Sequence, residues 1–224
     1  MEFDIIDLRD FTTDTRRTVD DYPYGGGCGM VIKPEPVKRA LDFAAGKVLS
    51  SGGSAPFSIY LTPQGSLLKQ KSVEQLSLKE HILLFCGHYE DIDYRARKLF
   101  DLELSIGDYV LSGGEPAAAV IADALIRKIP GSLSNPESSE EDSFSGGETL
   151  FDCPHYTRPP EWENKKVPEV LLNGDHKKIT AYRRARAIIN TMKTRPDLLK
   201  TEELSDSDFK ILKQYFLNYN ESED

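Results

Sequence analysis

The stretch His81-Ile-Leu-Leu-Phe-Cys-Gly87 places five consecutive apolar residues directly before a glycine. An apolar run of this length without polar alternation is typical of a strand that is covered on both faces. The stretch therefore predicts a fully buried strand over residues 81–86, in a parallel sheet with helices on either side.

Units of the same kind lie on both sides of this stretch. Before it, the apolar residues 57–61 stop at Thr62-Pro-Gln-Gly65, and a helix is expected at about 67–78. After it, Leu104-Ser-Ile-Gly-Asp-Tyr-Val-Leu-Ser-Gly-Gly114 ends in two glycines and leads into an Ala-rich helix over 115–128. Strands that alternate with helices, each ending in a Gly-rich turn, predict the α/β class with a parallel sheet.

The N-terminal part adds a strand, a loop and a helix to this prediction. Residues 3–8 (Phe-Asp-Ile-Ile-Asp-Leu) are expected to form a strand, and residues 35–46 a helix that ends before Gly46. Between them, Tyr22-Pro-Tyr-Gly-Gly-Gly-Cys-Gly29 contains too many glycines and prolines to continue either element, which predicts a loop.

The character of the sequence changes after Gly131. Residues 132–147 are rich in Ser, Glu and Gly with few apolar anchors, which is typical of a linker. Beyond them we expect helices over 177–193 and 206–217, the second with Phe209, Leu212 and Phe216 on one face. The predicted organisation is therefore an α/β domain over 1–132, a flexible linker over 133–148 and a helical domain over 149–224.

Composition narrows the class of protein. The 224 residues contain no apolar run near the roughly 18 residues that a membrane span needs, and the N-terminal residues do not resemble a secretion signal. The three cysteines are far apart and form no C-x-x-C pair, so neither a disulfide framework nor a metal site is expected. These features favour a cytoplasmic protein with no membrane partner.

Charge is distributed unevenly along the chain. The net charge of −9 argues against a nucleic-acid partner, yet residues 160–200 hold ten Lys or Arg against five Asp or Glu. A solvated helix face would explain this surplus as well as an RNA-binding surface would.

The three glycine-ended loops are the first candidate for a site. In parallel α/β sheets, ligands bind where the carboxyl ends of the strands meet. None of the loops has the spacing of a P-loop or of a dinucleotide-binding fingerprint. We therefore expect their backbone groups to hold a flat or zwitterionic ligand, the alternative being that the glycines only terminate strands.

Seven sequence motifs, taken together, resemble those of a known protein family. Together and in order they resemble the bacterial tRNA (guanine-N1)-methyltransferases of the TrmD family. The motifs are Thr18-Val-Asp-Asp-Tyr-Pro-Tyr-Gly-Gly-Gly-Cys-Gly-Met30, Leu61-Thr-Pro-Gln-Gly65, Cys86-Gly-His-Tyr-Glu-Asp-Ile-Asp93, Ser105-Ile-Gly-Asp-Tyr-Val-Leu-Ser-Gly-Gly-Glu115, Ile129-Pro-Gly131, Asp142-Ser-Phe144 and Asp152-Cys-Pro-His-Tyr-Thr-Arg-Pro159.

The resemblance implies more than the periodicity does. It implies a SPOUT-type fold whose parallel sheet ends in a C-terminal trefoil knot, a small C-terminal helical domain, and a homodimer with the active site shared between subunits. Two departures stand out: the family's N-terminal strand and helix before the position of Met1 are absent, and Asp91 stands where the family usually has Gly. A side chain at Asp91 is expected either to crowd the cofactor loop or to require a backbone turn that Asp still tolerates.

The cofactor implied by the resemblance is S-adenosylmethionine. By position, its contacts fall on Tyr60, Leu61, Thr62, Pro63, Gly87, Tyr89, Glu90, Ile106, Gly107, Asp108, Tyr109, Val110, Leu111, Gly113 and Gly114.

Methylation of guanine N1 needs a general base for the N1 proton and a donor for the charge that develops on O6. The resemblance assigns these roles to Asp142 and Arg127. Cys153 is expected to be structural, because attack by a ring nitrogen needs no thiolate. The substrate implied is guanosine 37 of tRNA, with RNA contacts expected from Lys177, Lys178, Arg183, Arg184, Arg186, His155 and Arg158.

Two other functions remain open at this point. One is a catalytically impaired tRNA-binding remnant, which the missing N-terminal unit and Asp91 suggest. The other is a SPOUT methyltransferase that acts on another RNA. Retention of both Asp142 and Arg127 argues against the first, and the block at Asp152–Pro159 argues against the second.

Overall fold

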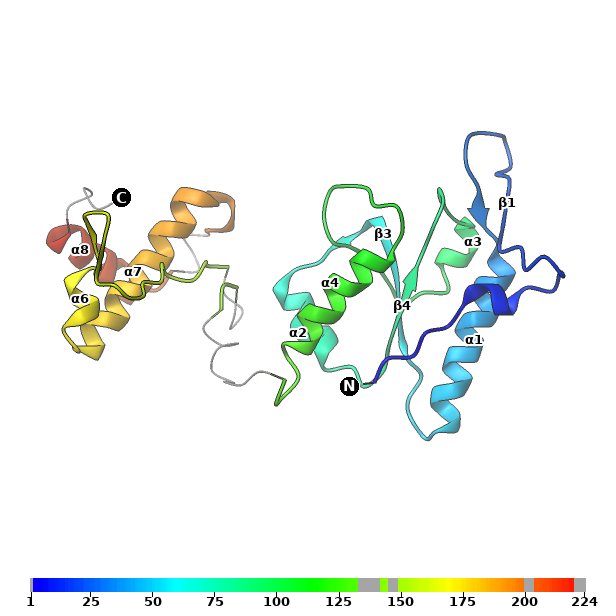
Figure 1. Ribbon diagram of the computed structural model, residues 1–224, viewed down its shortest axis with the longest axis horizontal. Coiled ribbons are helices and arrows are strands. Elements are labelled where there is room, and N and C mark those ends of the chain that lie inside the picture. Colours follow the sequence, from blue (N-terminus) through cyan, green and yellow to red (C-terminus); the bar gives the residue numbers. More distant parts are fainter. Residues whose placement is uncertain (1, 133–141, 145–148, 200–203, 220–224) are drawn as a thin grey trace. The chain divides into compact units, whose positions relative to one another are not determined.

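A computed structural model describes residues 2–132, 142–144, 149–199 and 204–219. The chain divides into two compact units, Met1–Ser134 and Asn135–Asp224 (Figure 1). Most of the predicted linker, residues 133–141 and 145–148, lies outside the described residues. Among the described residues, no helix has the length and apolar character required to cross a membrane.

The first unit is built on a parallel sheet. Strand β3 (Phe57–Leu67) is central, with β4 (Ile82–Cys86) on one side and β6 (Leu102–Ser105) on the other, both parallel to it. Helix α2 (Gln70–Ser77) connects β3 to β4, and helix α4 (Glu115–Ile126) follows β6. This arrangement confirms the predicted α/β class with a parallel sheet.

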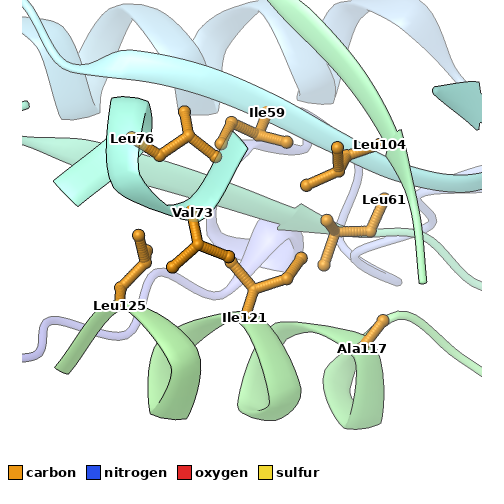
Figure 2. Close-up of a cluster of buried hydrophobic side chains, with 8 residues drawn as sticks. All are labelled: Ile59, Leu61, Val73, Leu76, Leu104, Ala117, Ile121 and Leu125. Carbon is orange, nitrogen blue, oxygen red and sulfur yellow. The ribbon is translucent and has the colours of Figure 1, made fainter. Parts of the chain in front are cut away.

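Helices cover both faces of this sheet (Figure 1). On one face, Ile59, Leu61 and Leu104 pack against α2 and α4 (Figure 2). On the other face, Tyr60 and Phe85 pack with residues of α1 (Pro34–Ser50) and α3 (Tyr94–Arg97). Successive residues of β3 point to opposite faces, which is why Ser58 through Thr62 are all buried.

A second, smaller sheet holds the Gly-rich loop. Strand β1 (Asp20–Asp21) pairs antiparallel with β2 (Val31–Ile32), and β2 pairs parallel with β5 (Asp91–Ile92). The predicted loop at residues 22–29 joins β1 to β2, and Glu90 donates its backbone N–H to the carbonyl of Met30 at 3.1 Å. The Gly-rich loop therefore neighbours the loop that follows β4.

The strand predicted at residues 3–8 is wrong. Residues 2–7 have no regular structure, and Asp7 caps a short 3-10 helix, η1 (Leu8–Phe11). Ile5 is 94% exposed, and no described strand pairs with this segment. Apolar residues alone do not make a strand, because the backbone groups of a strand need a partner to bond.

Three other boundaries differ from prediction. Helix α1 continues through Gly46 to Ser50, because Ala44 and Val48, four residues apart, keep its apolar face turned inward, and the chain turns only at Gly52 with φ +86°. Strand β3 extends past the expected stop to Leu67, with a register shift between Leu61 and Ser66, so α2 begins later than predicted.

Strand β4 is less buried than predicted. Only Phe85 of its residues is buried, because β4 lies at the edge of the described sheet.

The described residues of the second unit include a short hairpin and several helical elements. Strands β7 (Glu161–Trp162) and β8 (Lys165–Lys166) form the hairpin. The helical elements are α6 (Glu169–Leu172), α7 (His176–Thr194), η3 (Pro196–Leu198) and α8 (Asp206–Asn218). The predictions of α7 and α8 are confirmed.

The expected apolar face of α8 is not its buried face. Phe209 and Phe216 are 46% and 47% exposed. Helix α8 instead contacts α7 through the buried Asp208 and through Tyr215, whose ring lies 5.8 Å from that of Tyr182. A polar contact and an aromatic cluster, rather than the apolar spacing, therefore orient α8.

Candidate functional site

The three loops singled out from the sequence meet at one edge of the sheet. They follow β4 and β6 and interrupt β3, and these strands are parallel, so their carboxyl ends point the same way. The backbone N–H of Gly114 donates to the carbonyl of Gly87 at 2.9 Å. A Cβ on Gly65 would lie 2.4 Å from the backbone nitrogen of Leu104. The structure thus brings loops 62–65, 87–90 and 106–114 together.

Close packing explains several of the glycines. A Cβ on Gly114 would lie 2.6 Å from Cα of Cys86, and one on Gly87 would lie 3.2 Å from the ring of Tyr60. A Cβ on Gly113 would meet only side-chain atoms, those of Glu115 at 2.6 Å and His88 at 2.8 Å. Gly114 is therefore needed for the loops to touch, whereas Gly113 borders groups that can move.

The predicted cofactor residues differ in how far they are buried. Tyr60, Leu61, Thr62 and Gly114 are buried. Gly87, Ile106, Gly107 and Gly113 are half-buried, and the exposed members are Pro63, Tyr89, Glu90, Asp108, Tyr109, Val110 and Leu111. Tyr89 has φ +62°, a left-handed conformation that is uncommon for a residue with a side chain. The loops therefore offer buried backbone beneath a set of exposed side chains.

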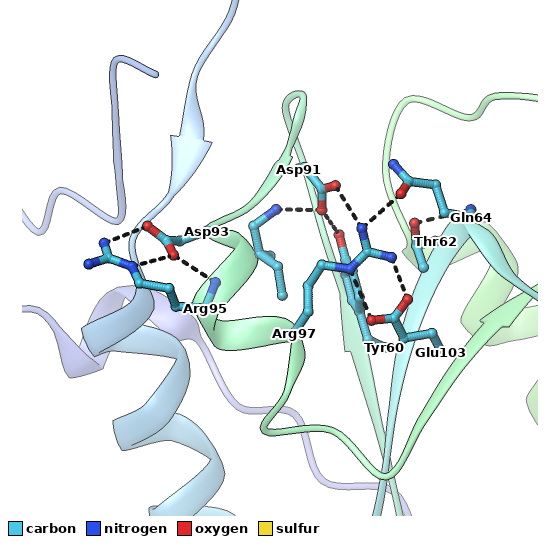
Figure 3. Close-up of polar contacts among 9 residues, drawn as sticks. Tyr60, Thr62, Gln64, Asp91, Asp93, Arg95, Arg97 and Glu103 are labelled. Carbon is cyan, nitrogen blue, oxygen red and sulfur yellow. Dashed lines mark hydrogen bonds and ion pairs between the residues drawn. The ribbon is translucent and has the colours of Figure 1, made fainter. Parts of the chain in front are cut away.

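Tyr60 is held by the residue that departs from the family pattern. Its hydroxyl donates to Oδ1 of Asp91 at 2.6 Å, and the backbone N–H of Ile92 donates to the same oxygen at 2.7 Å (Figure 3). Burial, with the neighbouring Asp91 carboxylate, raises the pKa of Tyr60, so the phenol remains a donor. Asp91 does not crowd the loop, because its carboxylate is bound within the unit.

A second side-chain pair that the sequence did not reveal joins two of the loops. Nε2 of His88 lies 2.6 Å from Oε1 of Glu115. Burial works to raise the pKa of Glu115, but the contact with His88 outweighs it and lowers that pKa below its usual value. No sequence signal links the two residues, which are 27 positions apart.

The two residues predicted for chemistry belong to different units. Arg127 caps the C-terminus of α4, its backbone N–H donating to the carbonyl of Asp123 at 3.2 Å, and its side chain is exposed. Asp142 is also exposed, in the second unit.

Contacts of the two residues after Asp142 fix the described segment that carries it. The backbone N–H of Phe144 donates to the carbonyl of Leu150, and that of Asp152 donates to Oγ of Ser143, both at 2.9 Å. The rings of Phe144 and Phe151 lie 5.4 Å apart. The described residues next to Asp142 are therefore anchored to residues 150–152 of the same unit.

The Asp152–Pro159 block contains a paired histidine and a buried cysteine. Nε2 of His155 lies 2.7 Å from Oδ2 of Asp152, and His155 and Arg158 are exposed. Cys153 is buried, and burial together with Asp152 raises the pKa of its thiol. A thiol that stays protonated supports the structural role expected for Cys153.

The five basic residues of α7 do not share one flank, which corrects the sequence prediction. Lys177, Lys178 and Arg183 are exposed. Arg184 instead pairs with the buried Asp208, Nε to Oδ1 at 2.7 Å, and Arg186 donates to the hydroxyl of Tyr215 at 3.1 Å. Arg184 and Arg186 thus join α7 to α8.

Comparison with known proteins gives a consistent match. Residues 1–201 match the family model described as "tRNA (Guanine-1)-methyltransferase TrmD". Three similar relatives carry the name tRNA (guanine-N(1)-)-methyltransferase. They are from Sulfurihydrogenibium sp. (47% identical over all of this chain and 85% of the relative), Persephonella marina (50% identical over 92% and 79%) and Thermosipho africanus (50% identical over 93% and 81%).

Proposed function

Because the chain belongs to the TrmD family of tRNA (guanine-1)-methyltransferases, we propose that it transfers the methyl group of S-adenosylmethionine to N1 of guanosine 37 in tRNA. The observation that carries this proposal is the gathering of loops 62–65, 87–90 and 106–114 at one sheet edge: Gly114 donates a hydrogen bond to the carbonyl of Gly87, and Gly65 packs against the backbone of Leu104 on β6. We further propose that this region forms the trefoil knot of the SPOUT fold and that the reaction takes place in the cytoplasm. The three free cysteines support a reducing compartment.

The loops suit a ligand that is bound mainly through backbone groups. A Cβ at Gly87 would lie 3.2 Å from the ring of Tyr60, and one at Gly113 would lie 2.6 Å from Glu115, so at both positions an added side chain would press on residues of the loops. The exposed Tyr89, Tyr109 and Leu111 supply apolar surface on the same loops. When bound there, S-adenosylmethionine supplies a methyl group activated by its positive sulfonium.

In the proposed mechanism, Asp142 and Arg127 act on the guanine. N1 of guanine carries a proton at neutral pH and is not nucleophilic until that proton is removed. The carboxylate of Asp142 accepts the N1 proton, and the guanidinium of Arg127 stabilises the negative charge that develops on O6. Both side chains are exposed in the described structure, which supports their access to an RNA base.

The second unit is proposed to bind the tRNA. Lys177, Lys178 and Arg183 are exposed on α7, where they can contact phosphates, and His155 and Arg158 are exposed on the preceding segment. We propose a homodimer in which the loops of one subunit and the second unit of its partner form the active site. Family membership supports this part of the proposal.

A methyl-transfer assay tests the function. The full chain is incubated with S-adenosylmethionine labelled in the methyl group and a tRNA transcript with guanosine at positions 36 and 37. We expect one labelled methyl per transcript, recovered as 1-methylguanosine. The matched control carries adenosine at position 37 and should stay unlabelled. Absence of transfer to the first transcript, or equal transfer to both, would contradict the proposal.

A further inference from the structure

A single arginine connects three segments of the proposed cofactor site (Figure 3). Nε of Arg97 donates to Oε1 of Glu103 at 2.9 Å, and Nη2 donates to Oε2 of the same carboxylate. Nη1 donates to Oε1 of Gln64 at 2.8 Å and lies 3.7 Å from Oδ2 of Asp91. The side chain of Arg97 is 11% exposed, so this guanidinium is largely withdrawn from water.

Each partner of Arg97 leads into a different loop. Gln64 lies in the loop that follows Leu61, and its backbone N–H donates to the hydroxyl of Thr62 at 3.3 Å. Asp91 directly follows the loop of Gly87 to Glu90. Glu103 lies on β6, which leads into the loop that begins at Ile106. The planar fork of an arginine can bind all three at once, which a lysine cannot.

Charge balance explains why a cation is required at this place. Asp91 and Glu103 are both acids with side chains only 26% and 30% exposed. The hydrogen bond to Glu103 raises the pKa of Arg97, and the same contact lowers the pKa of Glu103, so this pair is charged. Asp91, at the position where the family usually has Gly, adds a carboxylate that also needs a partner. Arg97 provides that partner within the same unit.

Asp91 links Arg97 to Tyr60. Its Oδ1 accepts the hydroxyl of Tyr60, whose ring faces Gly87 and lies 5.4 Å from the ring of Phe100 in a stacked arrangement. The rotation of the Asp91 carboxylate is therefore fixed by Tyr60 and Ile92 on one oxygen and by Arg97 on the other.

We propose that Arg97 is a positioning residue for methyl transfer: it holds Gln64, Asp91 and Glu103 in place, so that Tyr60 and the three loops are already arranged to receive the cofactor. This inference rests on the proposed function. Arg97 acts through its partners and touches no reacting atom. Its loss should weaken cofactor binding and leave the chemical step at saturation nearly unchanged.

The test compares the full-length parent with Arg97→Gln, and with Arg95→Gln as the matched control. Arg95 lies on the same helix, is 76% exposed and pairs with Asp93, its neighbour in sequence. We expect Arg97→Gln to raise the calorimetric Kd for S-adenosylmethionine and its KM about tenfold, with kcat within about twofold. Arg95→Gln should behave as the parent.

Two further variants separate positioning from a general loss of folding. The double variant Asp91→Asn/Arg97→Gln removes the carboxylate charge that requires the cation and keeps an oxygen acceptor for Tyr60, so it should recover part of the affinity that Arg97→Gln loses. Arg97→Lys keeps the charge without the fork and should fall between Arg97→Gln and the parent. Circular dichroism at the assay temperature identifies any variant that is not folded.

The outcomes distinguish the two proposals. If the parent does not bind S-adenosylmethionine, the proposed function fails, and this inference fails with it. If the parent binds it and folded Arg97→Gln binds equally well, only the role of Arg97 is overturned. That role is overturned as well if Arg97→Gln lowers kcat and leaves KM unchanged. If Arg97→Gln does not fold, Arg97→Lys decides: an affinity below the parent's supports the proposal, and an equal affinity contradicts it.

Discussion

The hydroxyl of Tyr60 donates a hydrogen bond of 2.6 Å to Asp91, and this contact joins the central strand β3 to the short strand β5 across 31 positions of sequence. Tyr60 is 3% exposed, and its ring lies over Gly87. The two residues therefore link the sheet that forms the core to the loop proposed to hold the cofactor. The Asp91 carboxylate is accommodated in the fold by this bond.

Tyr60→Phe should destabilise the first unit. The substitution keeps the ring packing and removes one donor from the Asp91 carboxylate, which should lower the free energy of unfolding by about 1–3 kcal/mol. Urea unfolding followed by circular dichroism measures the difference. Tyr22→Phe is the control, because Tyr22 is 80% exposed. Equal unfolding midpoints for Tyr60→Phe and the parent would contradict a stabilising role for the bond.

Gly113→Val should abolish binding of S-adenosylmethionine without unfolding the chain. The three atoms nearest to a Cβ at Gly113 belong to the side chains of Glu115 and His88, so the added groups should push these side chains into the proposed ligand space instead of displacing backbone. Calorimetry measures the loss of binding. Gly46→Ala is the control, because a Cβ there meets nothing within 4 Å and helix α1 should gain slightly in stability. Unchanged affinity in Gly113→Val would move the cofactor site elsewhere.

Asp142→Asn and Arg127→Gln should slow the chemical step and leave cofactor affinity intact. Loss of a general base typically costs about 10²–10⁴-fold, and loss of a charge-stabilising donor about 10²–10³-fold. The two losses should not add fully in the double variant, because both groups act on one developing charge. Single-turnover methyl transfer measures each rate.

Asp206→Asn serves as the control for these two variants, since Asp206 is an exposed acid of the second unit. If Asp142→Asn keeps its rate within about threefold of the parent, an effect far below the general-base range, Asp142 is not the base. Asp152 and His155, paired at 2.7 Å, are then the next residues to test.

The exposed cations of α7 should bind tRNA through phosphates. The triple variant Lys177→Ala/Lys178→Ala/Arg183→Ala should bind tRNA more weakly and show a smaller dependence of log affinity on log salt concentration, because fewer counterions are released. Filter binding over a range of salt concentrations measures both. Lys213→Ala, on the exposed surface of α8, is the control. A parental salt dependence in the triple variant would exclude this face of α7 as the RNA surface.

Acid should weaken the contact between α7 and α8. Pairing with Arg184 lowers the pKa of the buried Asp208 to about 2, below its value near 3.9 in an unfolded chain. The ion pair therefore contributes fully above about pH 4, and the contribution, about 2 kcal/mol, is lost as the pH falls toward 2. Urea midpoints at pH 5 and pH 2.5 measure this. Asp208→Asn should be less stable at pH 5 and should decline less with acid, whereas an equal decline would contradict the assignment.

Local patterns in the sequence were sufficient to predict two strands of the main sheet and the longer helices. The apolar runs that end at Gly87 and near Gly65 predicted β4 and β3, and apolar spacing at helical period predicted α4, α7 and α8. Side-chain periodicity and glycine conformations depend on residues a few positions apart, so a single sequence contains that information. That the three loops would meet at one edge of the sheet was predicted from the parallel direction of the strands alone.

Pairings between distant residues were decided only by the tertiary structure. The segment at Phe3 has the composition of a strand but no described partner, and the apolar side of α8 at Phe209 is exposed because Asp208 and Tyr215 make the contact with α7. The sequence predicted Arg184 as an RNA-binding cation, and only the structure shows that it pairs with Asp208, 24 positions later. Arg97 likewise lies in none of the sequence motifs, and its contact with Asp91 is visible only in the folded chain. A buried charge is stable only beside its counter-charge, and only the folded chain determines which two residues are neighbours.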